Sequence, residues 1–141
     1  MSTEKNKAAV RRYFEEVWNK GNLAALDEFA APNVVPHFLP PGLPANIEGF
    51  RQFIKLYRAA FPDVHMTVDE VIAEGDKLVD RWTATGTHKG QLMNFAPTFK
   101  KMTITGMHFE RFDDKGKLIE SYAEFDRVGM MQQLGLLPVP A

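Results

Sequence analysis

The first twenty residues carry apolar side chains with the period of an α-helix. Val10, Phe14 and Val17 recur on one face, and arginine, glutamate and lysine side chains fill the opposite face. This pattern predicts an amphipathic helix over residues 3–20. Gly21 follows directly, and glycine favours the left-handed backbone conformation that ends many helices. The first helix is therefore expected to end there.

Two more helices are predicted in the first half of the chain. A short one should follow Gly21 and end before Pro32, with a brief extended segment after it at 33–38. The prolines of 39–46 predict a loop, because proline fixes its own backbone and lacks an N–H donor. Helical spacing of apolar residues returns over 50–61 and stops at a Pro-Asp pair.

From residue 64 onward the apolar period changes from that of a helix to two, which is typical of β-strands. Glycine-containing turns separate the runs. The predicted strands cover 64–73, 78–87, 100–112 and 117–125, and a short helix is expected over 128–134. Helices followed by antiparallel hairpins indicate an α+β domain. We predict a curved antiparallel sheet with three N-terminal helices packed on its concave face, as a single domain over residues 1–141. Its open end should hold a small-molecule pocket.

Composition excludes several classes of function. The chain has no cysteine, which excludes a disulfide framework, a thiolate metal site and a thiol nucleophile. With 17 Lys+Arg against 18 Asp+Glu and no run of four basic residues, it lacks the basic surface expected for nucleic-acid binding. No apolar run approaches the ~18 residues that span a bilayer. The four histidines are not spaced as metal ligands. We therefore expect a cytoplasmic protein without metal or cofactor.

Four segments carry a resemblance to a known family. They are 16–26 (EVWNKGNLAAL), 86–90 (GTHKG), 116–120 (GKLIE) and 132–135 (QQLG). In this order, the chain resembles the SnoaL-like polyketide cyclase (ester cyclase) family of the nuclear transport factor 2-like, or cystatin-like, superfamily. The resemblance implies the same cone-shaped α+β fold and, as in many proteins of this superfamily, a homodimer formed through the convex sheet surface.

The resemblance also implies a reaction. Characterised cyclases of this family close a ring by an intramolecular aldol reaction without metal or organic cofactor, using an aspartate on the last strand and a histidine on the preceding strand. His108 matches the histidine position. Ala123 stands where the aspartate is expected, so the aldol machinery is incomplete unless Glu124 or Asp126 substitutes for it.

Each candidate catalytic residue has a structural alternative. Asp126 directly precedes the last predicted helix, where an N-cap would lower its pKa and make it a poor base. His108 alternates with apolar residues, so it is either a catalytic group or a hydrogen-bonded wall residue. Both interpretations remain open.

Arg81 is the third catalytic candidate. It lies in mid-strand, on the face opposite Trp82. If that face points into the pocket, its guanidinium could bind an enolate or carboxylate oxygen. The alternative is a structural ion pair with a carboxylate, for which we consider Asp80, Glu110 and Glu124.

Further residues are predicted to contact a substrate because they are aromatic, methionine or polar residues near the expected mouth or inner wall. They are Trp18, Trp82, His88, Met93, Phe95, Met107, Tyr122, Glu124 and Met130. His88 has the alternative role of holding its turn by hydrogen bonds. The functional hypothesis is a cofactor-free enzyme of the polyketide cyclase type, acting through an enolate (aldol closure or isomerisation) on a hydrophobic, oxygenated small molecule. The alternative is a non-catalytic binding or accessory protein with the same pocket, and the missing aspartate favours that alternative or a changed reaction.

Overall fold

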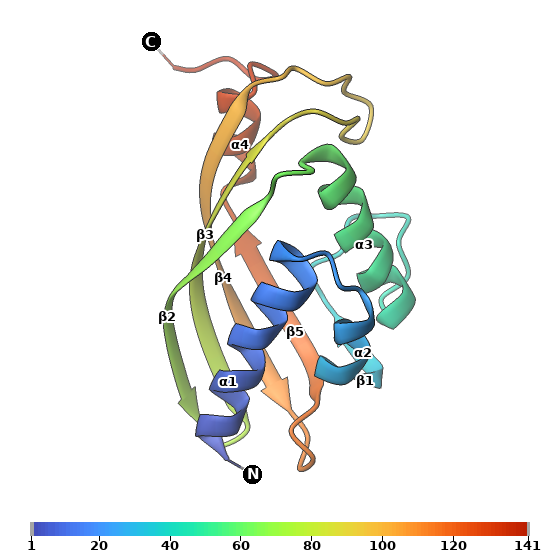
Figure 1. Ribbon diagram of the computed structural model, residues 1–141, viewed down its shortest axis with the longest axis vertical. Coiled ribbons are helices and arrows are strands. Elements are labelled where there is room, and N and C mark those ends of the chain that lie inside the picture. The colour runs from blue at the N-terminus through green and yellow to red at the C-terminus, as the bar shows by residue number, and fades with distance from the viewer. Residues whose placement is uncertain (1, 141) are drawn as a thin grey trace.

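The computed structural model describes residues 2–140 and shows one curved sheet with helices on its concave side (Figure 1). The sheet has five strands in the order β1-β5-β4-β3-β2. Their bounds are β1 Ala30–Pro36, β2 His65–Glu74, β3 Lys77–Thr87, β4 Lys101–Phe112 and β5 Leu118–Phe125. The N-terminal helices cover one face of the sheet, which confirms the predicted α+β class and the placement of these helices.

The helices begin and end close to the predicted positions. Their bounds are α1 Thr3–Tyr13, α2 Ala24–Phe29, α3 Ile47–Ala60 and α4 Arg127–Gln133. The first predicted helix is continuous but changes character, since α1 passes directly into a π-helical segment, η1 (Phe14–Asn19). Gly21 follows with a φ of +73°, as expected for a residue that ends a helix. α3 begins earlier than predicted because the Asn46 side chain accepts a hydrogen bond from the Gly49 N–H and caps it.

The segment around Pro32 differs from the prediction. The second helix ends at Phe29, and β1 begins at once and includes Pro32. This strand lies at the edge of the sheet and pairs with β5 in parallel, so the sheet is mixed where a purely antiparallel sheet was expected. Proline is tolerated there because an edge strand leaves one side of its backbone unpaired. The other strand pairs are antiparallel.

The inward faces of the two central strands determine where the pocket lies. On β3 the inward side chains include Leu78, Asp80 and Trp82, and on β4 they include His108 and Glu110. Cross-strand pairing places Asp80 directly opposite His108. Because side chains alternate along a strand, this register puts two ionisable groups among the buried apolar residues of the core. None of the helices in residues 2–140 is long and apolar enough to cross a membrane.

Candidate functional site

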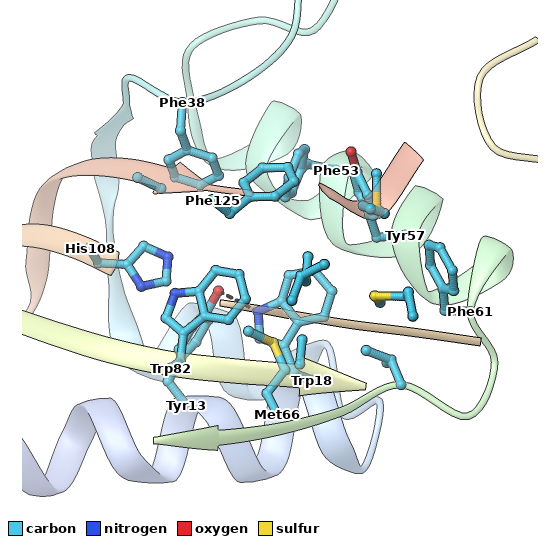
Figure 2. Close-up of a pocket in the computed structure, with 16 residues that line it drawn as sticks. Tyr13, Trp18, Phe38, Phe53, Tyr57, Phe61, Met66, Trp82, His108 and Phe125 are labelled. Atoms are coloured by element: carbon cyan, nitrogen blue, oxygen red, sulfur yellow. Dashed lines mark hydrogen bonds between the residues drawn. The ribbon is translucent and has the colours of Figure 1, made fainter. Parts of the chain in front are cut away.

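An aromatic cavity lies between the concave face of the sheet and the helices (Figure 2). It encloses about 610 Å³ of space between atoms, its open mouth included. The helices and the loop after β1 contribute Tyr13, Trp18, Phe38, Phe53, Tyr57 and Phe61, and the rest of the wall includes Val64, Met66, Trp82, Ala84, Met102, Ile104, His108, Ala123, Phe125 and Met130. His108 is the histidine of this wall, and the cavity is otherwise suited to an apolar ligand.

His108 is held by a carboxylate on the neighbouring strand. Its Nδ1 atom lies 2.9 Å from the Asp80 Oδ1 atom, and the side chain of Asp80 is completely buried, while that of His108 is 10% exposed. The rings of Phe14, Phe38 and Trp82 lie around the imidazole at centroid distances of 5.7, 6.3 and 5.9 Å. Because Nδ1 is engaged, Nε2 is the ring nitrogen that remains for a ligand, and it lies on the cavity side in Figure 2.

The charge of Asp80 changes the acidity of His108. Burial alone lowers the pKa of an imidazole, since it disfavours the charged form. At His108 the attraction and the hydrogen bond of Asp80, with a smaller contribution from Glu110, outweigh burial, and the pKa is raised above its ordinary value. The imidazole is therefore a stronger base than a free histidine and becomes a stabilised cation when it takes up a proton.

The other neighbour of His108 is Ala123 on β5. The two residues are paired across the strands, and Ala123 lines the cavity. A carboxylate at this position would face the imidazole from the β5 side. In this chain the carboxylate beside the imidazole is Asp80, which comes from β3 on the opposite side. An aspartate-histidine pair is thus present, but its aspartate comes from β3 and not from the position on the last strand that the family resemblance implied.

Three aromatic residues bring polar hydrogen atoms to the cavity wall. Trp82 lies across Gly106, where any β-carbon would meet the indole ring at 2.2 Å, so glycine is required at this crossing. The Trp82 Nε1–H is buried without a hydrogen-bond partner among residues 2–140, and Figure 2 shows it on the side of the ring that faces His108. The Trp18 Nε1–H donates to the Tyr13 hydroxyl at 2.8 Å, which leaves the Tyr13 O–H free to donate.

A second carboxyl group lies beyond His108 along β4. Glu110 is 2% exposed, and it faces the same side of the sheet as His108. Burial raises its pKa to about 7, opposed by the charge of His108, while Asp80 raises it further and Ser121 lowers it. One donor atom from each of Asp80, His108 and Glu110 lies within 4.8 Å of the others. Carboxylates and imidazole can bind divalent cations, and the expectation of no metal site, which rested on histidine spacing, did not consider this mixed group.

Four of the residues predicted from sequence lie on the outer face of the sheet. Arg81 contacts Asp69 and Glu70 at 3.7 and 3.4 Å, and its side chain is 45% exposed. Met107, Tyr122 and Glu124 also point outward and are exposed. The condition under which Arg81 was expected to act, an inward-facing guanidinium, is not met.

Asp126 lies at the N-terminus of α4. Its Oδ1 atom accepts a hydrogen bond from the Gly129 N–H at 2.8 Å, and the residue is exposed. This is the capping role that the sequence offered as the alternative. The side chain is not among those that line the cavity.

His88 and the loop after it form a separate cluster. The His88 Nδ1 atom accepts a hydrogen bond from the Thr98 N–H at 3.2 Å and lies 3.0 Å from the Thr98 hydroxyl, and burial lowers the pKa of the ring. This geometry agrees with the alternative that His88 holds its turn. In the same loop Met93 is exposed, and Phe95 packs partly against the core. Of the predicted contact residues, Trp18, Trp82 and Met130 line the cavity.

The fold and the site together define an α+β cone with an apolar pocket and one histidine-carboxylate pair on its floor. Residues 8–134 match the profile of the family described as SnoaL-like polyketide cyclase, and the chain belongs to this family. The predicted family is therefore confirmed. The comparison with curated proteins gave no match.

Solved structures agree with this assignment. A proposed polyketide cyclase from Acidithiobacillus ferrooxidans is 33% identical, with a TM-score of 0.81 over 96% of this chain and 98% of that chain. IdmH, a proposed polyketide cyclase from Streptomyces antibioticus, is 31% identical, with a TM-score of 0.80 over 92% and 98%. TsrD from Streptomyces laurentii is 23% identical with a TM-score of 0.88 over 97% and 99%, a likeness of fold alone.

Asp80, Glu110 and Tyr13 were not predicted to be site residues. Asp80 and Glu110 were considered only as ion-pair partners for Arg81. A signal was present, since both acids occupy inward positions of strands on which most of the other inward residues are apolar. An acidic residue at such a position is rare unless it is paired. The partner itself could not be identified without the strand register.

Proposed function

We propose that this protein is a cofactor-free enzyme that removes a C–H proton next to a carbonyl group of an apolar, oxygenated small molecule, with His108 as the base. The observation that carries the proposal is the buried pair of Asp80 and His108 on the floor of an aromatic cavity, with the Nε2 atom of His108 left for the substrate. Membership of the polyketide cyclase family supports a small molecule as the substrate.

The site residues support each stage of proton removal. The Nε2 atom takes the proton, and the electron pair of the C–H bond moves to form the enolate, whose charge resides on the former carbonyl oxygen. The resulting imidazolium is stabilised by Asp80. Two buried donors, the Trp82 N–H and the Tyr13 O–H, are available to the enolate oxygen. Oriented donors in a cavity that excludes water stabilise a developing negative charge strongly.

Ring closure follows without any added group. The enolate carbon attacks a second carbonyl carbon of the same molecule, and the new alkoxide takes back the proton held by His108. The imidazole returns to its neutral form, so atoms and charges balance over the cycle. The cavity contributes by folding the substrate so that the two carbons meet. In an isomerisation, the same proton returns to a different carbon.

The test measures exchange of the acidic C–H proton with deuterium in a panel of β-keto esters by NMR, which detects the first step even when no ring closes. His108→Asn should reduce catalysed exchange by about 100-fold or more. His37→Asn is the matched control, because His37 also contacts a carboxylate but lies at the surface. Equal exchange rates in His108→Asn and the wild type would exclude this proposal.

The alternative of a binding protein predicts a different result in the same experiment. The apolar lining and Ala123 are the observations that favour it. A binding protein would bind members of the panel, as followed by quenching of the Trp18 and Trp82 fluorescence, and would give no exchange above the buffer rate.

We also propose that two copies associate through the outer face of the sheet. Val79, Phe109 and Tyr122 form a row of paired residues across β3, β4 and β5, and each is about two-fifths to one-half exposed. Exposed apolar rows of this kind favour association with a similar surface. Sedimentation should give the mass of a dimer for the wild type and of a monomer for Phe109→Lys, and a monomeric wild type would exclude the proposal.

A further inference from the structure

Glu110 is a buried acid beside the pair of Asp80 and His108. It lies two residues beyond His108 on the same face of β4, and it is paired across the sheet with Leu78 and Ser121. Among residues 2–140, neither lysine nor arginine forms an ion pair with it, and its Oε2 atom has no hydrogen-bond partner. The Oδ2 atom of Asp80 is likewise buried and unpartnered.

The groups around Glu110 come from several elements. They are Tyr13 on α1, Asp80 on β3, His108 on β4 and the hydroxyl of Ser121 on β5. If both carboxyl groups were ionised beside a neutral imidazole, this cluster would carry two negative charges in the core. Two like charges held close together in an apolar setting cannot both be kept without a large cost, so one of them binds a proton.

The proton can reside on Glu110 or on His108, and its position decides whether His108 can act as a base. In one arrangement Glu110 is neutral and His108 is neutral, so Asp80 is the one ionised group of the three. In the other, Glu110 gives its proton to His108, and all three groups are charged. The first arrangement has fewer buried charges, and in it the imidazole is free to accept a proton from a substrate.

We propose that Glu110 is a positioning residue that keeps a proton in the resting site and thereby leaves His108 neutral, with Asp80 as its ionised partner. The effect of Glu110 on the reaction rate rests on the proposed function, whereas the protonation of the cluster does not depend on any substrate. Burial raises the pKa of Glu110 to about 7, so Glu110 keeps its proton up to the pH range in which His108, whose pKa is also raised, gives up its own.

The test follows the ring signals of histidines labelled with ¹³C as a function of pH, in the wild type and in Glu110→Gln. His108→Asn identifies which signal belongs to His108. In the wild type, His108 should show two inflections, because the ionisation of Glu110 adds a negative charge beside the ring. Glu110→Gln keeps a neutral polar group of similar shape. In this variant His108 should show one inflection, at lower pH than the upper of the two wild-type inflections.

Two further variants keep the test decisive. Glu120→Gln removes a glutamate from the outer face of the sheet and should leave the His108 titration unchanged. If Glu110→Gln does not fold, Glu110→Met should give the same single inflection, because it also lacks a charge. The infrared band of a protonated carboxylic acid should be present in the wild type near pH 6 and absent from either Glu110 variant.

Two results would overturn the proposal. One is an identical His108 titration in the wild type and both Glu110 variants. The other is a rise in the unfolding temperature of several degrees on adding Zn²⁺ or Mn²⁺ to the wild type but not to Glu110→Gln, which would show that the cluster holds a cation in place of a proton. Failure of the proposed function is distinguishable, because it appears as unchanged proton exchange in His108→Asn whatever the titration shows.

Discussion

Two histidine-carboxylate pairs with almost the same geometry lie on opposite faces of the sheet. His108 and Asp80 are 2.9 Å apart on the concave face, with side chains that are 10% and 0% exposed. His37 and Glu120 are 2.8 Å apart on the convex side, with side chains that are 35% and 27% exposed. Glu120 also contacts Arg111 at 3.1 Å, and His37 stacks on Tyr122.

The difference shows that the environment, more than the distance, decides what such a pair does. Water and a second cation surround the outer pair, so the attraction between its members is weakened and shared. The inner pair is enclosed by aromatic rings, and no arginine or lysine in the described residues contacts it. In this setting a charge on one group strongly affects the protonation of the other. The inner pair is therefore suited to proton transfer and the outer pair to surface structure.

The largest expected effect comes from breaking the inner pair through charge alone. Asp80→Asn keeps the shape of the side chain but removes the negative charge that stabilises the imidazolium. We expect the rate of catalysed C–H exchange to fall about 100-fold or more, and the pKa of His108 to fall because Asp80 no longer opposes the effect of burial. The exchange assay measures the first effect and NMR titration the second.

Glu120→Gln is the matched change in the outer pair. It should leave the exchange rate and the His108 titration within experimental error of the wild type. If Asp80→Asn and Glu120→Gln behaved alike in both measurements, the contrast between the two pairs would be disproved.

The fold was largely predictable because apolar periodicity is a local property. The change from a helical period to a period of two marked the border between α3 and β2, and the four long strands followed from it. β1 was predicted only in part, as an extended segment at 33–38, because Pro32 signals a break. The strand tolerates this proline because it lies at an edge of the sheet. The position of a strand within a sheet is a tertiary property that no local pattern reveals.

The site was less predictable because it depends on strand register. His108 was found through its family position, while Asp80 lies 28 residues earlier and meets it only because β3 and β4 pair as they do. The alternation along β3 correctly separated Arg81 from Trp82. It could not decide which of the two pointed inward, and this choice determined whether Arg81 or Asp80 entered the core.

A second prediction moves the carboxylate to the other side of His108. Asp80→Ala should lose most of the exchange activity. The double variant Asp80→Ala, Ala123→Asp should be at least about tenfold more active than Asp80→Ala, because residue 123 also faces the imidazole. Ala123→Asp alone should lower the free energy of unfolding by about 1–3 kcal/mol, since it places another acid in the cavity. A double variant no more active than Asp80→Ala would show that the β3 side is essential.

A third prediction concerns the pH dependence of stability. The pKa values of His108 and Glu110 are both raised in the folded protein, from 6.5 and 4.5 respectively. Glu110 thus binds an extra proton in the folded state between pH 4.5 and about 7, and His108 does so above pH 6.5. The free energy of unfolding should fall as pH rises through these ranges. The slope is at most about 1.4 kcal/mol per pH unit for each proton.

The range above pH 6.5 isolates the inner cluster. His88 has a lowered pKa and contributes in the opposite direction, but mainly below pH 6.5. The carboxyl groups with lowered pKa values, such as Asp63 and Glu120, contribute only in more acidic solution. Urea unfolding at several pH values measures the slope. It should be smaller in the double variant Asp80→Asn, Glu110→Gln, and an equal slope would contradict the assignment of these protons to the cluster.

The smallest expected effect comes from Asp126, a third carboxylate whose partner is a backbone N–H. It is exposed like the outer pair, yet it makes a specific hydrogen bond to Gly129 at the start of α4. Asp126→Ala should lower the free energy of unfolding by about 1 kcal/mol, while Asp126→Asn should change it much less, because asparagine is an equally good N-cap. Urea unfolding measures both values. Neither variant should change the exchange rate, because the role of this carboxylate is confined to one helix end. A tenfold loss of rate in Asp126→Asn would contradict this and would support a catalytic role for Asp126.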